Sequence, residues 1–164
     1  MNKKINIQSL VDQIEKITKE KIASESVVSL DEYRRLKNKT KQRFNILVID
    51  DDETMRKALV RLLESDGYQV ISAADGTQLE KVFSKDSVDL ILLDIGLPWV
   101  NGLELTNVLK NHDDLKEIPI VLITGSTSKE DLDKGLALGA EAFIKKPFDV
   151  EILKSTVKNL IQKN

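Results

Sequence analysis

Three runs of four consecutive apolar residues, 46–49, 90–93 and 120–123, constrain the fold of this chain most strongly. A strand that is apolar at successive positions is buried on both faces, which is typical of a parallel sheet with helices on each side. These runs alternate with stretches of helical period, as in repeated strand-helix units. The expected strands are residues 44–49, 69–73, 89–93, 118–123 and 142–144, and the expected helices lie at about 54–66, 77–83, 103–109, 130–138 and 150–161.

The order of these elements predicts an α/β fold with a doubly wound parallel sheet of five strands. Crossovers between parallel strands are right-handed, which leaves few strand orders, and we expect the flavodoxin-like order 2-1-3-4-5. The first and third strands are then neighbours, at the point where the strand order reverses. We expect residues 44–164 to form this domain and residues 1–43 to form a helical extension and linker.

The first 43 residues differ from the rest in charge and in pattern. They carry 11 basic and 6 acidic side chains, whereas the remainder of the chain is acidic overall. A short amphipathic helix is indicated by an apolar stripe made of Ile7, Leu10, Ile14 and Ile17. A capping box at Ser29 and Glu32 predicts a second helix that ends near Lys39. The stripe needs an apolar partner in its own α/β domain, a second copy or another protein, and we favour a self-dimer or a docked partner.

Composition excludes several classes of site. Without cysteine the chain has no disulfide bonds and no cysteine-ligated zinc, and its single histidine, His112, cannot form a histidine cluster. The N-terminus lacks the apolar core of a secretion signal, and no run approaches the roughly 20 apolar residues of a membrane span. We therefore expect a cytoplasmic protein without membrane contact. The net charge of -2 favours no nucleic-acid partner, and the basic residues near the second predicted helix are interpreted as a solvated helix end.

Polar side chains stand where four of the predicted strands end. They are Asp50, Asp51 and Asp52 after the first strand, Asp94 after the third, Thr124 after the fourth, and Lys145 and Lys146 after the fifth. Ligands of doubly wound sheets bind beyond the carboxyl ends of the strands, near the reversal of strand order. We therefore expect Asp50, Asp51 and Asp94 to converge there. Thr124 and one lysine would close the site, and because neighbouring residues of a strand point to opposite faces, we choose Lys146.

Clustered carboxylates repel one another unless a cation neutralises them. Mg2+ prefers oxygen ligands and keeps several waters, so Asp50, Asp51, Asp94 and the backbone carbonyl of Gly96 are a suitable ligand set. Asp52 or Glu53 is expected to cap the helix that follows. Beside Mg2+ and an ammonium group, the Asp94 carboxylate can attack an activated phosphoryl group. Lys146 and Thr124 would then contact the phosphoryl oxygens.

Four segments, residues 46–52, 89–98, 120–125 and 142–148, together resemble the receiver domain of bacterial two-component response regulators. The resemblance implies a phosphorylation switch, not an enzyme with an external substrate. By this resemblance, Asp94 accepts a phosphoryl group from a histidine kinase or from a histidine phosphotransfer protein of a phosphorelay, and Mg2+ is the cofactor of the transfer. Thr124 and Lys146 read the phosphate, and Phe143 is the aromatic switch residue. A downstream protein or a second copy of the chain would receive the signal.

Two other interpretations stay open. Residues 50–54 are similar to the Asp-x-Asp-x-Thr motif of haloacid-dehalogenase-type phosphatases, with Asp50 as nucleophile and Asp52 as acid and base, but Asp94 then has no role. Alternatively, the domain is an interaction module that does not depend on phosphorylation. The chain also departs from the family pattern at Asp52, Gly96, Asn101 and Trp99, and Trp99 is expected to pack on the surface of its loop.

Overall fold

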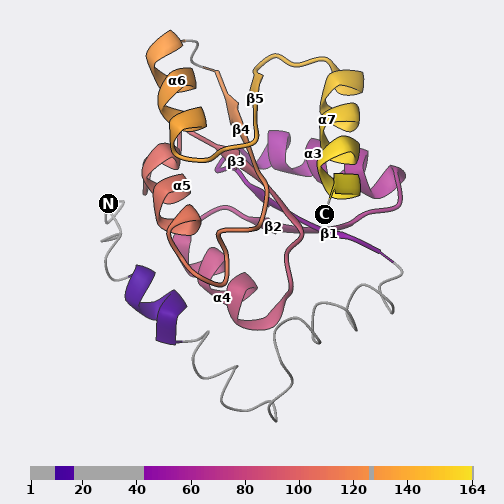
Figure 1. Ribbon diagram of the computed structural model, residues 1–164. Helices are drawn as coiled ribbons and strands as arrows, with labels where there is room; N and C mark the ends of the chain where they lie inside the picture. The colour runs from indigo at the N-terminus through magenta and orange to yellow at the C-terminus, as the bar shows by residue number, and fades with distance from the viewer. Residues whose placement is uncertain (1–9, 17–42, 126–127, 164) are drawn as a thin grey trace.

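The computed structural model describes residues 10–16, 43–125 and 128–163. In this part of the chain, strands and helices alternate as the apolar pattern predicted (Figure 1). The strands are β1 (Asn45–Ile49), β2 (Gln69–Ala73), β3 (Leu90–Asp94), β4 (Ile120–Thr124) and β5 (Ala142–Lys145). The helices are α3 (Glu53–Ser65), α4 (Gly76–Lys85), α5 (Gly102–Lys110), α6 (Lys129–Ala137) and α7 (Val150–Lys163). None of the helices in the described ranges has the length and hydropathy needed to cross a membrane.

The five strands form one parallel sheet in the order β2-β1-β3-β4-β5, which confirms the predicted fold class. β3 and β4 are buried along their whole length. Both extend one residue further than the sequence predicted, because Asp94 still pairs with Ile123 in the ladder and Thr124 pairs with Lys145. The polar residues that were expected to follow these strands are therefore their last residues.

Helices cover both faces of the sheet, and the alternation of side chains along each strand supplies an apolar layer to each face. One layer holds Leu47, Ile91 and Leu122 together with apolar residues of α4 and α5. The other holds Val48, Leu92 and Val121 together with apolar residues of α3 and α7. Figure 1 shows α3 and α7 on one side of the twisted sheet and α4 and α5 on the other.

The start of α3 depends on a side chain that the sequence singled out. Asp52 is the N-cap, and its carboxylate accepts hydrogen bonds from the backbone N–H groups of Thr54 and Met55. This satisfies two of the donors that a helix leaves free at its first turn. At the other end Gly67 has a φ of 89°, a conformation that favours glycine. The predicted cap at Asp52 is confirmed.

Residues 10–16 are helical and pack on the α/β domain. Leu10 is 2% exposed and Ile14 is 1% exposed, and both belong to the apolar cluster that contains residues of α4 and α5. In Figure 1 this segment, drawn in indigo, lies beside these two helices. The chain's own domain therefore covers this part of the apolar stripe. Ile7, Ile17 and the second predicted helix lie outside the described residues, and a self-dimer through the N-terminal helices stays a prediction.

Truncation of Ile14 tests whether this segment stabilises the domain. We expect Ile14→Ala to lower the free energy of unfolding by about 1–3 kcal/mol, because it removes buried methyl groups and leaves a cavity. Denaturant unfolding followed by circular dichroism measures the change. Gln13→Ala, at an exposed position of the same segment, is the control and should change the free energy by less than about 0.5 kcal/mol. Equal stability of the two variants would show that the segment does not contribute.

Candidate functional site

Two buried carboxylates lie side by side at the carboxyl edge of the sheet. Ile49 of β1 pairs with Leu93 of β3, so Asp50 and Asp94 follow on neighbouring strands. Asp50 is 2% exposed and Asp94 is 9% exposed. Carboxylate oxygens of Asp50, Asp51 and Asp94 lie within 4.8 Å of one another. The structure thus brings together the three acidic residues that the sequence placed at the ends of separate segments.

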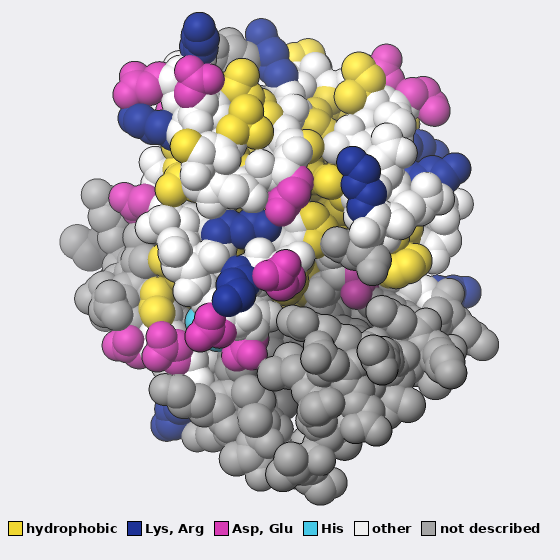
Figure 2. Space-filling view, viewed as in Figure 1, with side chains coloured by type: hydrophobic (Ala, Val, Ile, Leu, Met, Phe, Trp, Pro, Cys, Tyr) yellow, Lys and Arg dark blue, Asp and Glu magenta, His cyan; other side chains and the backbone are white. Residues whose placement is uncertain are grey.

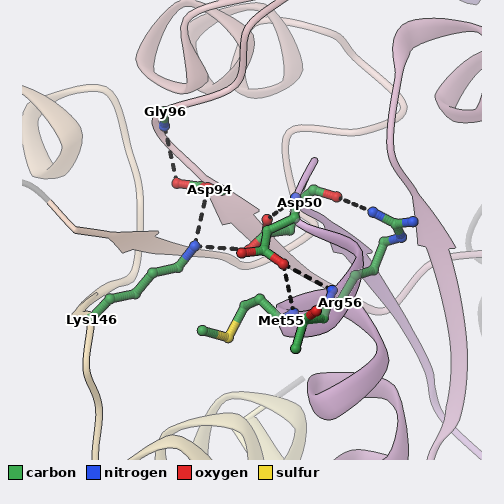
Figure 3. A network of polar contacts seen from close by, with 8 residues as sticks. Asp50, Met55, Arg56, Asp94, Gly96 and Lys146 are labelled. Carbon is green, nitrogen blue, oxygen red and sulfur yellow. Dashed lines mark hydrogen bonds and ion pairs between the residues drawn. The ribbon is translucent and has the colours of Figure 1, made fainter.

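Lys146 bridges the two buried carboxylates. Its ammonium group donates to Asp50 Oδ2 at 2.9 Å and to Asp94 Oδ2 at 3.1 Å (Figure 3). Its backbone N–H donates to the carbonyl of Thr124 at 2.7 Å, which holds the residue against the end of β4. The Lys146–Pro147 peptide bond is cis. Lys145 is exposed, so it is Lys146 that the structure brings to the acidic residues.

Backbone N–H groups hold the other oxygen of each buried carboxylate. Asp52 N–H donates to Asp50 Oδ1 at 2.8 Å, and Gly96 N–H donates to Asp94 Oδ1 at 3.0 Å. Both carboxylates are therefore held on two sides, by an amide and by Lys146. Gly96 contacts Asp94 through its N–H, and the role of its carbonyl as a metal ligand stays a prediction.

Thr124 and Phe143 lie on the two strands that follow β3 in the sheet order. Thr124 is the last residue of β4, is 3% exposed, and follows Ile123, which pairs with Asp94. Phe143 pairs with Leu122 on β5, and its half-buried side chain packs against the apolar cluster on the α4 and α5 side. Thr124 is thus on β4, the strand next to β3, and Phe143 is on β5, the strand after β4 in the sheet. Their roles in reading a phosphate stay predictions.

Burial and charge shift the pKa values of the central pair. Burial raises the pKa of Asp50, and this outweighs the hydrogen bonds from Lys146 and from Asp52 N–H, which lower it. Burial alone would lower the pKa of Lys146, but its hydrogen bonds to Asp50 and Asp94 prevail and raise it. The lysine is therefore charged at neutral pH, and Asp50 carries its negative charge at a cost in free energy. A further cation beside Asp50 would reduce that cost.

Comparison with known proteins places this site in a family. The sequence model of the response regulator receiver domain matches residues 46–158. The chain belongs to the response regulator receiver domain family. It is 34% identical over 117 residues to the polar-differentiation response regulator DivK of Brucella anthropi, a match that covers 71% of this chain and 95% of DivK. The chain therefore carries a receiver domain of two-component signalling.

The chain is also similar to part of a sensor kinase and to a solved chemotaxis protein. The CAI-1 autoinducer sensor kinase/phosphatase CqsS of Vibrio cholerae is 33% identical over 154 residues, which cover 93% of this chain but 22% of CqsS. The crystallised chemotaxis protein CheY4 of Vibrio cholerae is 32% identical, with a TM-score of 0.66. That match covers 72% of this chain and 98% of CheY4. The receiver is thus similar both to a short regulator and to a small part of a long kinase.

The acidic residues of this receiver fit a small divalent cation. Ligands about 2.1 Å from one Mg2+ ion are at most about 4.2 Å apart, so the three carboxylates, within 4.8 Å of one another, need only small shifts. Asp51 is exposed, which leaves a side open to the waters that Mg2+ keeps. Asp50 and Asp94 are each held on one oxygen by a backbone N–H. We therefore expect Asp50, Asp51 and Asp94 to hold Mg2+.

Two residues near Asp94 have roles that the sequence did not reveal. Trp99 was expected on the surface, but it is 7% exposed, and its indole N–H donates to the Ala74 carbonyl at 3.0 Å. It ties the loop after β3 to the loop after β2. Gly102 begins α5, and a Cβ there would lie 2.6 Å from both the Asp94 carbonyl oxygen and Ile95 Cα. Only glycine allows α5 to start this close to the acceptor strand.

The geometry disfavours the phosphatase interpretation. Asp52, its expected acid and base, caps α3 with its carboxylate. Asp50, its expected nucleophile, is almost fully buried and accepts hydrogen bonds from Lys146 and Asp52 N–H. Asp94, which that interpretation leaves without a role, lies at the centre of the site.

Mg2+ should stabilise the receiver more at neutral than at acidic pH. The folded-state pKa of Asp50 lies above its ordinary value of 3.8. Protonated Asp50 therefore contributes stability to the folded state below pH 3.8. This contribution is lost as the pH rises through the raised pKa and the buried carboxyl becomes charged. Because Mg2+ binds deprotonated carboxylates, it restores stability in that range. At about 100 times its Kd, Mg2+ should raise the free energy of unfolding by about 2–3 kcal/mol near neutral pH, and by less as the pH falls toward 3.8.

Thermal unfolding with and without Mg2+, at matched ionic strength, measures this difference. Asp50→Asn is the control, since it removes the charge that titrates and should remove most of the Mg2+ effect. An equal effect of Mg2+ at neutral and at acidic pH would contradict the linkage to Asp50.

Proposed function

We propose that this receiver is a phosphorylation-dependent signalling switch in which Asp94 accepts a phosphoryl group with the help of Mg2+. The observation that carries the proposal is the contact of one ammonium group, Lys146 Nζ, with both Asp50 and Asp94. Lysine and metal charges beside a buried carboxylate suit phosphoryl transfer, in which negative charge on the transferring oxygens must be neutralised.

The phosphoryl donor is a phosphohistidine of a histidine kinase or a histidine phosphotransfer protein. In the transfer, an Asp94 carboxylate oxygen forms a bond to phosphorus while the bond from phosphorus to the imidazole nitrogen breaks. The bonding electron pair returns to the imidazole. Bound Mg2+ supplies positive charge to the phosphoryl oxygens. The Lys146 ammonium stands beside the attacking carboxylate, and the similarity to a sensor kinase supports a kinase as the partner.

The signal would leave the domain through Thr124 and Phe143. Thr124 ends β4 next to the site, and Phe143 is packed on β5, so a shift of one into contact with a phosphate can alter the other. The neighbouring helices carry exposed apolar side chains, Leu136 on α6 and Val150 and Ile152 on α7. Figure 2 shows hydrophobic side chains among charged ones over this upper part of the molecule. We propose a downstream protein as the partner of this face, in the cytoplasm.

Incubation of the chain with acetyl phosphate and Mg2+ tests the proposal. We expect the intact mass to rise by one phosphoryl group only when Mg2+ is present, and hydroxylamine to remove the group, because an acyl phosphate reacts with this nucleophile. Trp99, the only tryptophan, provides a second signal through its emission. A chain that gains no phosphoryl group under these conditions would be an interaction module that does not depend on phosphorylation.

A further inference from the structure

Asp51 is the one member of the acidic trio that no side chain holds in place. Its carboxylate is exposed and has no hydrogen bond to the described residues. Asp50 and Asp94 are each held by Lys146 and a backbone N–H. Yet an Asp51 oxygen lies within 4.8 Å of oxygens of both partners. The direction of the Asp51 side chain must therefore be set by the backbone that carries it.

That backbone is held by Arg56. The guanidinium Nη1 of Arg56 donates to the carbonyl oxygen of Asp50 at 2.8 Å. This carbonyl belongs to the peptide group that joins Asp50 to Asp51, so its direction determines where Asp51 begins. The Asp50 N–H bonds to the Ala73 carbonyl at 3.3 Å. Both backbone groups of Asp50 are therefore hydrogen-bonded, the N–H to Ala73 and the carbonyl to the side chain of Arg56.

Arg56 reaches this carbonyl from the first turn of α3. Its backbone N–H donates to the Asp52 carbonyl at 2.9 Å, which makes it part of the helix that Asp52 caps. Figure 3 shows Arg56 and Lys146 approaching Asp50 from opposite sides. Lys146 contacts the carboxylate and Arg56 contacts the carbonyl, so the two cations serve different parts of the same residue.

We propose that Arg56 is a positioning residue for the cation site, because its hydrogen bond to the Asp50 carbonyl fixes the peptide that aims Asp51 at Asp50 and Asp94. The inference rests on the proposed binding of Mg2+ by these carboxylates. Arg56 does not contact the ion in this role. It acts through the backbone of two metal ligands.

The charge of Arg56 and its hydrogen bond to the Asp50 carbonyl should have opposite effects on Mg2+ affinity. A positive charge near a cation site repels the cation, so loss of the Arg56 charge alone would tighten Mg2+ binding. Loss of the hydrogen bond leaves the Asp50–Asp51 peptide free to move. Asp51 must then be ordered when the ion binds, and the free-energy cost of this ordering weakens binding. The sign of the change in Mg2+ affinity therefore separates the two roles.

Titration calorimetry of the full chain with MgCl2 tests the proposal with two substitutions of Arg56. Arg56→Met keeps the aliphatic stem and removes donor and charge, and we expect it to raise the Kd for Mg2+ about fivefold, as for one lost hydrogen bond. Arg56→Lys keeps a donor and the charge and should stay within about twofold of the unchanged chain. Arg61→Met removes an exposed arginine from the same helix and should not raise the Kd.

An unchanged or lower Kd for Arg56→Met would overturn the inference while Mg2+ binding by the unchanged chain still stood. Absence of Mg2+ binding by the unchanged chain would overturn the proposed function and the inference together. Thermal unfolding without Mg2+ verifies that each variant is folded. If Arg56→Met does not fold, Arg56→Gln carries the same test, since its shorter side chain also gives up the contact.

Discussion

Replacement of Asp94 by asparagine should abolish phosphoryl acceptance and leave the receiver folded. Asparagine has nearly the same shape, and its single amide oxygen can keep one of the two hydrogen bonds that the Asp94 carboxylate accepts, from Gly96 N–H to Oδ1 or from Lys146 to Oδ2. A neutral amide is a far weaker nucleophile than a carboxylate, and its product would not be an acyl phosphate. We expect the rate of phosphorylation by acetyl phosphate to fall by at least about a hundredfold.

Intact-mass spectrometry after incubation with acetyl phosphate and Mg2+ measures this loss. Asp113→Asn is a matched control, because it removes an exposed carboxylate far along the chain from the site, and it should be phosphorylated like the unchanged protein. If Asp94→Asn gained a phosphoryl group at the original rate, the acceptor would be another residue.

Replacement of Lys146 by methionine should have opposite effects on the metal and on the phosphoryl group. Its ammonium contacts one oxygen each of Asp50 and Asp94, so it competes with a cation for both carboxylates. Loss of this charge should tighten Mg2+ binding on the order of tenfold. Phosphoryl acceptance should nevertheless fall by about a hundredfold to a thousandfold, because charge that develops on the transferring oxygens loses a positioned donor.

Titration calorimetry with MgCl2 and the mass assay measure the two effects on one sample. Lys145→Met is the matched control, because it removes the adjacent lysine, which is exposed. In the described part of the chain it is Lys146 that contacts Asp50 and Asp94, so both properties should stay unchanged in this variant. If Lys146→Met bound Mg2+ less tightly, the lysine would be needed to hold the carboxylates in place. If its phosphorylation stayed at the original rate, Lys146 would have no part in the transfer.

Much of the fold and the outline of the site follow from local features of the sequence. Continuous apolar runs such as residues 90–93 predict strands buried on both faces, because each face of the sheet needs apolar side chains. Parallel strands all end at one edge, so polar residues that end strands meet there once the order is known. For this reason Asp50 and Asp94 could be expected close together, although 43 residues lie between them in the chain.

Other features depended on contacts that no local pattern contains. Trp99 is buried because the loop after β2 provides a carbonyl for its indole N–H, and a tryptophan in a polar loop does not reveal this. Gly102 is needed because α5 starts against the backbone of Asp94 and Ile95. Leu10 and Ile14 pack with residues of α4 and α5, whereas their stripe predicted only that some apolar partner exists.

The sequence by itself determined the parallel sheet, its strand order and the gathering of acidic residues at one edge, since each rests on the period of apolar side chains and on the handedness of crossovers. Tertiary structure alone decided which oxygen each donor contacts, how Arg56 reaches the Asp50 carbonyl and where the N-terminal segment packs. Periodicity states which face of an element is apolar. The partner of that face, and the distance between groups far apart in the chain, are properties of the packed molecule.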